Sequence, residues 1–329
     1  MRVRLPLVLI SGAVIVAGCT DSTGPSAASS QQQQPVTGIF LTRQAAAQKA
    51  NADLMAERGG NGNARNHGGG GGTGIFYHGG PVIYQQKVAA VYWGTSVIYN
   101  GGPTPGTTGT GAQDGSLIGF FLRNLGGSAY FNINTTYFDG TNTHVQNSVT
   151  YTQYWADNSA PGSTVSDAQL QAEVVKGLNS GALTYDPNTL YHVFTGKGIN
   201  LGGGFGSQYC AYHGNFTWNG KDVKYSAMPY DYTFPSACSA LNGSPNNDPA
   251  ADAEVNTMAH ETEETTTDED LNAWYDRSGN ENADKCAWMF GATYTSANGS
   301  VANEKIGGKD FLVQMNWINS GSGGCRQGL

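Results

Sequence analysis

The residues best suited to chemistry lie in the segment His-Glu-Thr-Glu-Glu over 260–264. On a helix, His260 and Glu264 are four residues apart, so their side chains lie on one face. The zinc motif H-E-x-x-H spaces its two ligands in this way, and here Glu264 replaces the second histidine. Because carboxylate is a competent zinc ligand, the pattern predicts a metal held by His260 and Glu264, with Glu261 as the general base for a metal-bound water.

A third metal ligand has three candidates downstream. Asp270 lies at the offset that one class of zinc peptidases uses, but Thr267 stands where their turning glycine belongs. Glu281 and Asp284 lie farther along, at a span typical of zincins whose third ligand follows on another helix. We predict Asp284 as the third ligand, with Glu281 and Asp270 as alternatives.

Acidic residues gather around this segment. The stretch between Lys224 and Arg277 contains no Lys or Arg, yet it holds 11 of the 25 acidic residues of the chain. Like charges at helical spacing repel each other, so a bound cation would offset them. Zinc is the predicted cofactor. Calcium in an oxygen cage is the alternative, although His260 would be a poor ligand for it, and a solvated acidic face without metal is the remaining interpretation.

The amino-acid composition indicates an exported protein and argues against one class of partner. The chain has 329 residues, of which 47 are glycine and only 13% are charged, which is typical of a loop-rich exported protein. Its net charge is −8 and it has no Lys or Arg cluster, which argues against nucleic acid as a partner.

The N-terminal sequence predicts export and a lipid anchor. Two arginines precede an apolar stretch over 5–16, and Val-Ala-Gly-Cys over 16–19 resembles a bacterial lipobox. We therefore predict a signal peptide over 1–18, a membrane anchor on Cys19 and a flexible linker over 19–74. Thr20 is not the aspartate that retains lipoproteins at the inner membrane, so we expect an extracytoplasmic site at the outer membrane or cell surface. The folded domain is expected over 75–329.

Four cysteines remain for disulfides once Cys19 carries the lipid. An even number in an oxidising compartment allows three pairings. We favour Cys210 with Cys238 and Cys286 with Cys325, because these pairs close the shorter loops. A four-cysteine zinc site is the rival, but the C-x-x-C spacing it usually needs is absent.

The pattern of apolar residues predicts an α+β fold. Strands are expected over 81–94, 146–155, 190–195, 223–230 and 310–318, helices over 114–124, 166–178 and 251–267, and a glycine-rich loop or edge strand over 202–216. This order resembles that of zincin domains, in which the last helix carries metal ligands. We expect a single zincin-like domain with a mixed, twisted sheet and an active-site helix, stapled by disulfides.

Several motifs together resemble a known family. They are Met-Ala-His-Glu-Thr-Glu-Glu over 258–264, Leu-Asn-Ala-Trp-Tyr over 271–275, Glu-x-x-Asp-x-Cys over 281–286, Tyr-His-Gly-Gly-Pro-Val over 77–82, Cys-Ala-Tyr-His-Gly over 210–214, and Phe-Leu-Val-Gln over 311–314 with Cys325. In this order they resemble the EXORDIUM or phosphate-induced protein family over about 75–329. The resemblance implies an extracellular protein, linked in plants to growth and phosphate responses.

The family pattern contains residues that match His260, Glu261, Glu264, Glu281 and Asp284, whereas Asp270 has no consistent counterpart. Two cysteines of the plant form, one ahead of Cys210 and one near Cys238, have no equivalent here. We interpret His213 as a structural histidine beside a disulfide rather than as a donor to the transition state.

These observations predict a zinc-dependent hydrolase outside the cytoplasm, most similar to a peptidase, acting on a peptide or a cell-envelope polymer. The metal would be held by His260, Glu264 and Asp284, and Glu261 would activate the water. The alternative is a non-catalytic envelope protein that binds polysaccharide or a partner, with a structural metal or none. In either case we expect a monomer.

Overall fold

The structure is a computed structural model that describes residues 38–59, 74–240 and 243–329. The predicted signal peptide, the lipid site Cys19 and the linker segments 20–37 and 60–73 lie outside the described residues. Within the described part, no helix has both the length and the apolar character needed to cross a membrane.

The strands are β1 (Ile39–Leu41), β2 (Phe76–Tyr77), β3 (Gln86–Trp93), β4 (Thr107–Thr110), β5 (Val149–Asp157), β6 (Thr189–Thr195), β7 (Tyr209–Trp218), β8 (Lys221–Met228), β9 (Trp274–Tyr275), β10 (Tyr294–Thr295), β11 (Val301–Ala302), β12 (Glu304–Ile306), β13 (Lys309–Phe311), β14 (Asn316–Trp317) and β15 (Cys325–Arg326). The α-helices are α1 (Arg43–Gly59), α2 (Leu117–Leu125), α3 (Asp167–Ser180), α4 (Pro235–Cys238) and α5 (Pro249–Thr267). Short 3₁₀ helices are η1 (Gly111–Gln113), η2 (Phe131–Thr136), η3 (Asp231–Thr233) and η4 (Asp284–Cys286).

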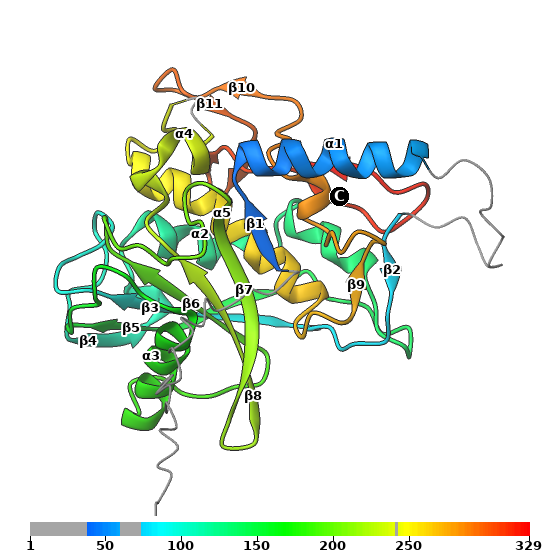
Figure 1. Ribbon diagram of the computed structural model, residues 1–329. Helices are drawn as coiled ribbons and strands as arrows, with labels where there is room; N and C mark the ends of the chain where they lie inside the picture. The colour runs from blue at the N-terminus through cyan, green and yellow to red at the C-terminus, as the bar shows by residue number, and fades with distance from the viewer. Residues whose placement is uncertain (1–37, 60–73, 241–242) are drawn as a thin grey trace, which may run out of the picture. The chain divides into compact units, whose positions relative to one another are not determined.

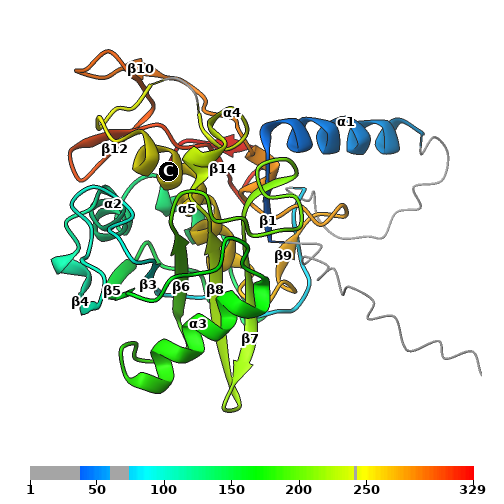
Figure 2. The same ribbon diagram turned by 60° about the vertical axis from the view of Figure 1, so that its left-hand side comes forward.

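A mixed seven-stranded sheet organises the fold, in the order β1-β7-β8-β6-β3-β5-β4. Strands β8, β6, β3 and β5 run parallel, whereas β7 is antiparallel to β8. Two apolar clusters cover its faces: Phe121 of α2 and Met258 of α5 belong to one, and Leu170 and Val174 of α3 to the other. Figures 1 and 2 show α3 on one side of the sheet and α5 on the other. This α+β architecture confirms the predicted fold class.

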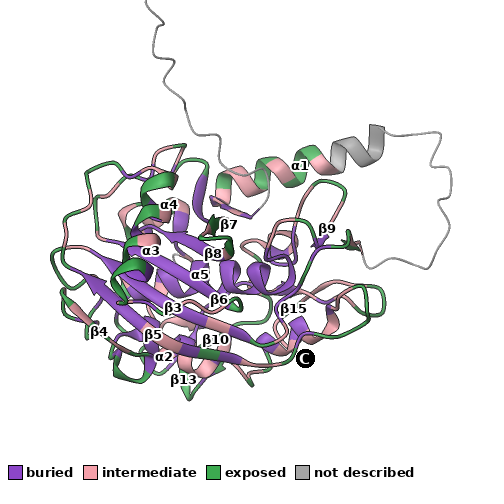
Figure 3. Ribbon diagram, turned by 90° about the horizontal axis from the view of Figure 1, so that it is seen from below, coloured by how far each residue is buried: buried purple, intermediate pink, exposed green. Residues whose placement is uncertain are grey.

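Helix α5 is the central element of the fold. Pro249 occupies its first turn, where a missing N–H costs nothing, and the Asp248 side chain caps the helix by accepting from Ala251 N. Every residue from Ala253 to Thr267 is buried, so this helix lies inside the molecule despite its acidic sequence (Figure 3). A buried helix rich in Glu must have its charges satisfied from within the protein.

The folded structure begins earlier than the sequence predicts. We expected residues 38–59 to belong to the flexible linker, but Ile39–Leu41 form edge strand β1, antiparallel to β7. Phe40 is fully buried in the core, and α1 follows from Arg43. The physical reason is that three residues can form a strand when a sheet offers an unpaired edge, although the surrounding composition resembles a linker.

The last predicted strand is also different. Residues 310–318 do not extend the main sheet but form parts of two small hairpins, β12–β13 and β14–β15. Between the two hairpins, Gln314 N donates to Asn256 Oδ1 of α5. The Asn303 side chain donates to Val313 O and accepts from Val313 N. The segment is therefore held against α5 by side chains. The apolar residues over 310–318 therefore indicate a buried segment and not a strand of the main sheet.

The two predicted disulfides are confirmed. Cys210 in β7 is joined to Cys238 in α4, with Cα atoms 5.5 Å apart. Cys286 in η4 is joined to Cys325 in β15, with Cα atoms 5.7 Å apart.

Candidate metal centre

One face of α5 carries three polar side chains toward β7 and the loop before η4. His260, Glu261 and Glu264 are all fully buried. The helical spacing of four residues places His260 Nε2 only 2.9 Å from Glu264 Oε1, as the sequence predicts. Burial lowers the pKa of His260 to about 4 and raises the pKa of Glu261 and Glu264 well above their usual range. The imidazole is therefore neutral at pH 7.

Asp284 joins this pair from the first position of η4. Its Oδ1 lies 3.6 Å from His260 Nε2, and its backbone N–H donates to Glu264 Oε1 at 3.0 Å. Potential ligand atoms of His260, Glu264 and Asp284 all lie within 4.8 Å of one another. The structure thus brings together the three residues that the sequence predicts as metal ligands.

Gln314 orients the histidine. Its Nε2 donates to Ala283 O at 2.8 Å and lies 3.0 Å from His260 Nδ1, while its Oε1 accepts from Trp288 N. These partners fix the amide, so Nδ1 accepts and the ring proton of neutral His260 is on Nε2, which is buried without a hydrogen-bond partner among the described residues.

His213 forms a second group with two of the same acids. It lies in β7, where Tyr212 faces α3 and the alternation of side chains turns His213 toward α5. Its Nδ1 lies 3.1 Å from Glu261 Oε2 and 3.6 Å from Glu264 Oε2. Sequence reasoning missed this role; the signal available was the period of two along the strand, which places His213 on the face opposite Tyr212.

Glu281 completes the cluster. Its Oε1 lies 3.7 Å from His213 Nε2, and its backbone N–H donates to Asp284 Oδ2. Burial, followed by the charge of Glu264, raises its pKa well above the usual value. Glu281, an alternative third ligand, therefore lies beside His213 rather than beside His260.

The cluster has an excess of acid. Among the described residues, the only partners within ion-pair distance of Glu261, Glu264, Glu281 and Asp284 are the two histidines. Burial and Glu264 raise the pKa of Asp284 to about 8. Without a cation, these carboxyl groups must hold protons, because several uncompensated negative charges cannot share a buried site.

Two other acids of the segment lie elsewhere. Asp270, the other alternative ligand, belongs to a separate group in which Lys224 contacts Asp222 at 2.6 Å and Glu269 at 2.9 Å. Glu263 lies on a different side of α5, where its Oε2 accepts from Asn316 Nδ2 at 2.6 Å. Neither belongs to the cluster around the two histidines.

A pocket of about 620 Å³ reaches this cluster from outside. Asp284 lies in its wall, together with Lys49 of α1 and with Lys285 and Trp288 of the following loop. The Asp284 side chain is 13% exposed, whereas the five other members of the cluster are at 0%. Access from solvent therefore leads to Asp284.

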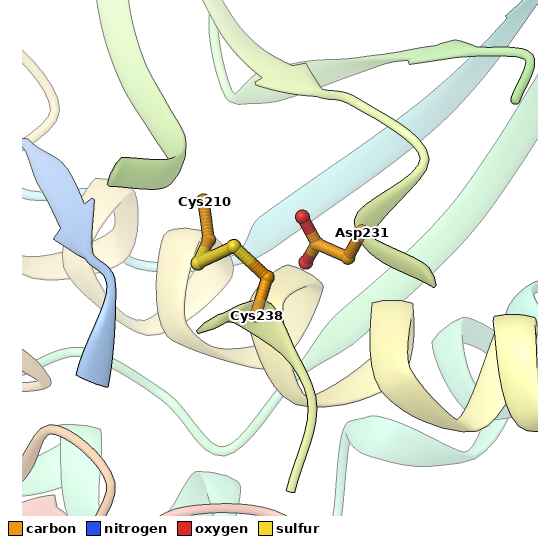
Figure 4. A group of neighbouring side chains, drawn as sticks. All are labelled: Cys210, Asp231 and Cys238. Atoms are coloured by element: carbon orange, nitrogen blue, oxygen red, sulfur yellow. A yellow bond between two sulfur atoms is a disulfide. The ribbon is translucent and has the colours of Figure 1, made fainter. Parts of the chain in front are cut away.

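A third grouping of possible ligands is not a metal site. Cys210, Asp231 and Cys238 lie close together, but Figure 4 shows the two sulfurs joined in the disulfide, with Asp231 beside it. The Asp231 carboxylate instead accepts from the Thr257 hydroxyl.

The sequence also matches a family. The sequence model of the phosphate-induced protein 1 conserved region matches residues 126–316, a span that contains every member of the cluster. No curated protein and no solved structure matches the chain. On the strength of the family match, which covers more than half of its length, the chain belongs to the phosphate-induced protein 1 family.

Proposed function

We propose that this protein is a zinc-dependent hydrolase, most similar to a peptidase, with the metal held by His260, Glu264 and Asp284. The observation that supports it is the spacing of the ligand atoms. Two ligands of a tetrahedral zinc with bonds of about 2.0–2.1 Å lie roughly 3.3 Å apart, and the distances from His260 Nε2 to the two carboxylates, 2.9 and 3.6 Å, bracket this value.

Metal binding at His260 would require the neighbouring Gln314 side chain to rearrange. A cation at His260 Nε2 replaces the ring proton, which then belongs on Nδ1. Gln314 must turn its amide so that Oε1 accepts this proton, because a metal-bound imidazole usually donates its other N–H to an acceptor. The turn gives up two present bonds, from Gln314 Nε2 to Ala283 O and from Trp288 N to Gln314 Oε1.

Zinc bound there would polarise a substrate carbonyl and lower the pKa of water to about 7. Glu261 is the proposed base that takes a proton from the attacking water. Its Oε1 has no hydrogen-bond partner among the described residues, while Oε2 is 3.1 Å from His213 Nδ1, which orients the carboxylate. Substrate, a peptide or related envelope polymer, would approach through the pocket at Asp284.

The test uses the purified full chain, treated with chelator and reloaded with zinc. We expect zinc binding and cleavage of internally quenched peptides. Glu261→Gln should retain zinc and lose about 10²–10⁴-fold in rate, the usual contribution of a general base. Glu264→Gln should lose the zinc. Glu263→Gln is the matched control, since this buried glutamate on the same helix points elsewhere, and it should keep both properties. A wild-type chain that binds no zinc and cleaves nothing would refute the proposal.

A second candidate is a non-catalytic envelope protein with a structural cation. The observation that favours it is burial, because catalytic zinc sites keep an open position whereas structural sites are closed, and only Asp284 of the cluster is exposed. This candidate predicts that chelator lowers the melting temperature of both wild type and Glu261→Gln, with no peptide cleavage by either. Added metal should restore the melting temperature.

A further inference from the structure

Glu264 lies between two histidines that come from different elements. Its Oε1 is 2.9 Å from His260 Nε2, on the same helix, and its Oε2 is 3.6 Å from His213 Nδ1, on β7. One carboxylate thus presents a separate oxygen to each imidazole. This is the arrangement of a carboxylate that bridges two cations.

The group around His213 offers the same types of metal ligand as the proposed site at His260. His213 Nδ1, Glu261 Oε2 and Glu264 Oε2 give one imidazole and two carboxylates. The distances of 3.1 and 3.6 Å from the imidazole again bracket the roughly 3.3 Å expected between ligands of a tetrahedral zinc. The two halves of the cluster therefore offer equivalent chemistry around a shared residue.

Several buried polar atoms of the cluster lack a hydrogen-bond partner among the described residues, which points to a bound ligand. Within the described residues, Glu264 Oε2, Glu261 Oε1 and His213 Nε2 are buried without a hydrogen-bond partner. Each unpaired buried polar group costs about 1–3 kcal/mol. A single cation at the first site would leave the side at His213 unsatisfied.

We propose that His213, Glu261 and Glu264 form a second divalent-cation site, with Glu264 bridging it to the site at His260 and Asp284. This inference rests on the proposed metal at the first site. Glu281 Oε1, 3.7 Å from His213 Nε2, is the group placed to accept the ring proton of His213 when Nδ1 binds a cation.

A regulatory consequence follows from the shared residue Glu261. In the proposed function Glu261 takes a proton, but as a ligand at the second site it can no longer do so. The first site borders the pocket and fills first, whereas the ligands of the second are fully buried. Excess metal therefore inhibits the enzyme.

The experiment titrates the chelator-treated full chain with Mn²⁺ and reads both stoichiometry and electron paramagnetic resonance. Spins that share a carboxylate couple, so the second equivalent should change the spectrum of the first. His213→Asn should bind one ion, Glu264→Gln should bind none tightly, and Glu263→Gln, the control, should bind two coupled ions. If His213→Asn fails to fold, the wild-type spectrum still decides.

Binding of one equivalent, or of two ions without spin coupling, overturns the second site. Peptide cleavage by a chain that takes up only one ion even in excess metal would overturn this inference alone, and two coupled ions with no cleavage at any metal loading would overturn the proposed function alone. Zn²⁺ titration tests the inhibition: the rate should peak near one equivalent and fall as the second binds, with no fall in His213→Asn. A rate unaffected by the second equivalent overturns the inhibitory role.

Discussion

The ring of Phe40 packs against the imidazole of His260, with ring centroids 4.2 Å apart. Phe40 lies in β1, outside the region that matches the family. His213 N donates in turn to Gly38 O at 2.8 Å. A short segment near the N-terminus thus covers a cluster formed by residues 170 or more positions away.

Phe40→Ala should therefore cost about 3–5 kcal/mol in the free energy of unfolding, since it removes a fully buried ring from the core. Amide exchange at His213 should become faster, because the partner strand is released. Urea denaturation and hydrogen exchange measure the two effects. Phe76→Ala in β2 is the control, with a ring that is 38% exposed. Equal losses in the two variants would mean that β1 contributes little to the fold.

Gly38→Ala should disturb His213 directly. Gly38 has φ of 71°, and an added Cβ would lie 2.9 Å from Leu271 Cδ2 and 3.0 Å from His213 Cε1. Gly181→Ala is matched in backbone, with φ of 75° but nothing within 4 Å of the added atom. We expect a loss of about 1–2 kcal/mol at Gly181 from the left-handed conformation alone, and a larger loss at Gly38 together with a shifted His213 ring resonance. Equal effects would contradict the close contact.

Gln314→Leu should weaken metal binding about 10–100-fold, as is typical when a group that orients a ligand is removed. Gln314 holds His260 through Nδ1 and, through Ala283 O, the loop that carries Asp284. Zinc affinity measured with a competing chelator tests this. Asn316→Leu offers a comparison, since Asn316 contacts Glu263 instead. Unchanged affinity in Gln314→Leu would remove Gln314 from any orienting role.

Glu173 should make stability depend on pH. Burial, followed by neighbouring Asp157, raises its pKa from 4.5 to about 7. Because the folded state holds the proton more tightly than the unfolded state, this contribution is complete below about pH 4.5 and is lost as the pH rises through 7. Glu173→Gln cannot ionise, so it should match wild type at pH 4 and exceed it by about 2 kcal/mol at pH 8. Denaturation at both pH values measures this difference, and parallel curves for the two proteins would contradict it.

Local patterns predicted much of the fold. Helix α5 was expected over 251–267 and spans Pro249–Thr267, because its caps and its burial agree with the sequence pattern. The two disulfides followed from loop length. The convergence of His260, Glu264 and Asp284 also matches the prediction, because helical spacing fixes the first two and the third follows closely in sequence.

Long-range pairing could not be predicted in the same way. Strand β1 is three residues long, and its partner β7 lies about 170 positions away, so no local pattern reveals it. His213 reaches the cluster only because β7 pairs with β8 in a register that turns it toward α5. Asp270 had a suitable offset, but Lys224 of β8 draws it into another charge group.

Both disulfides lie next to members of the cluster. Cys210 is three residues before His213, and Cys286 is two residues after Asp284. The segments that bring His213 and Asp284 to α5 are therefore each attached by a disulfide. Disulfides form only under oxidising conditions. Oxidative folding therefore helps to fix the centre: in a chain kept with reduced thiols we expect the helical pair His260 and Glu264 to form, but Asp284 to be held less firmly.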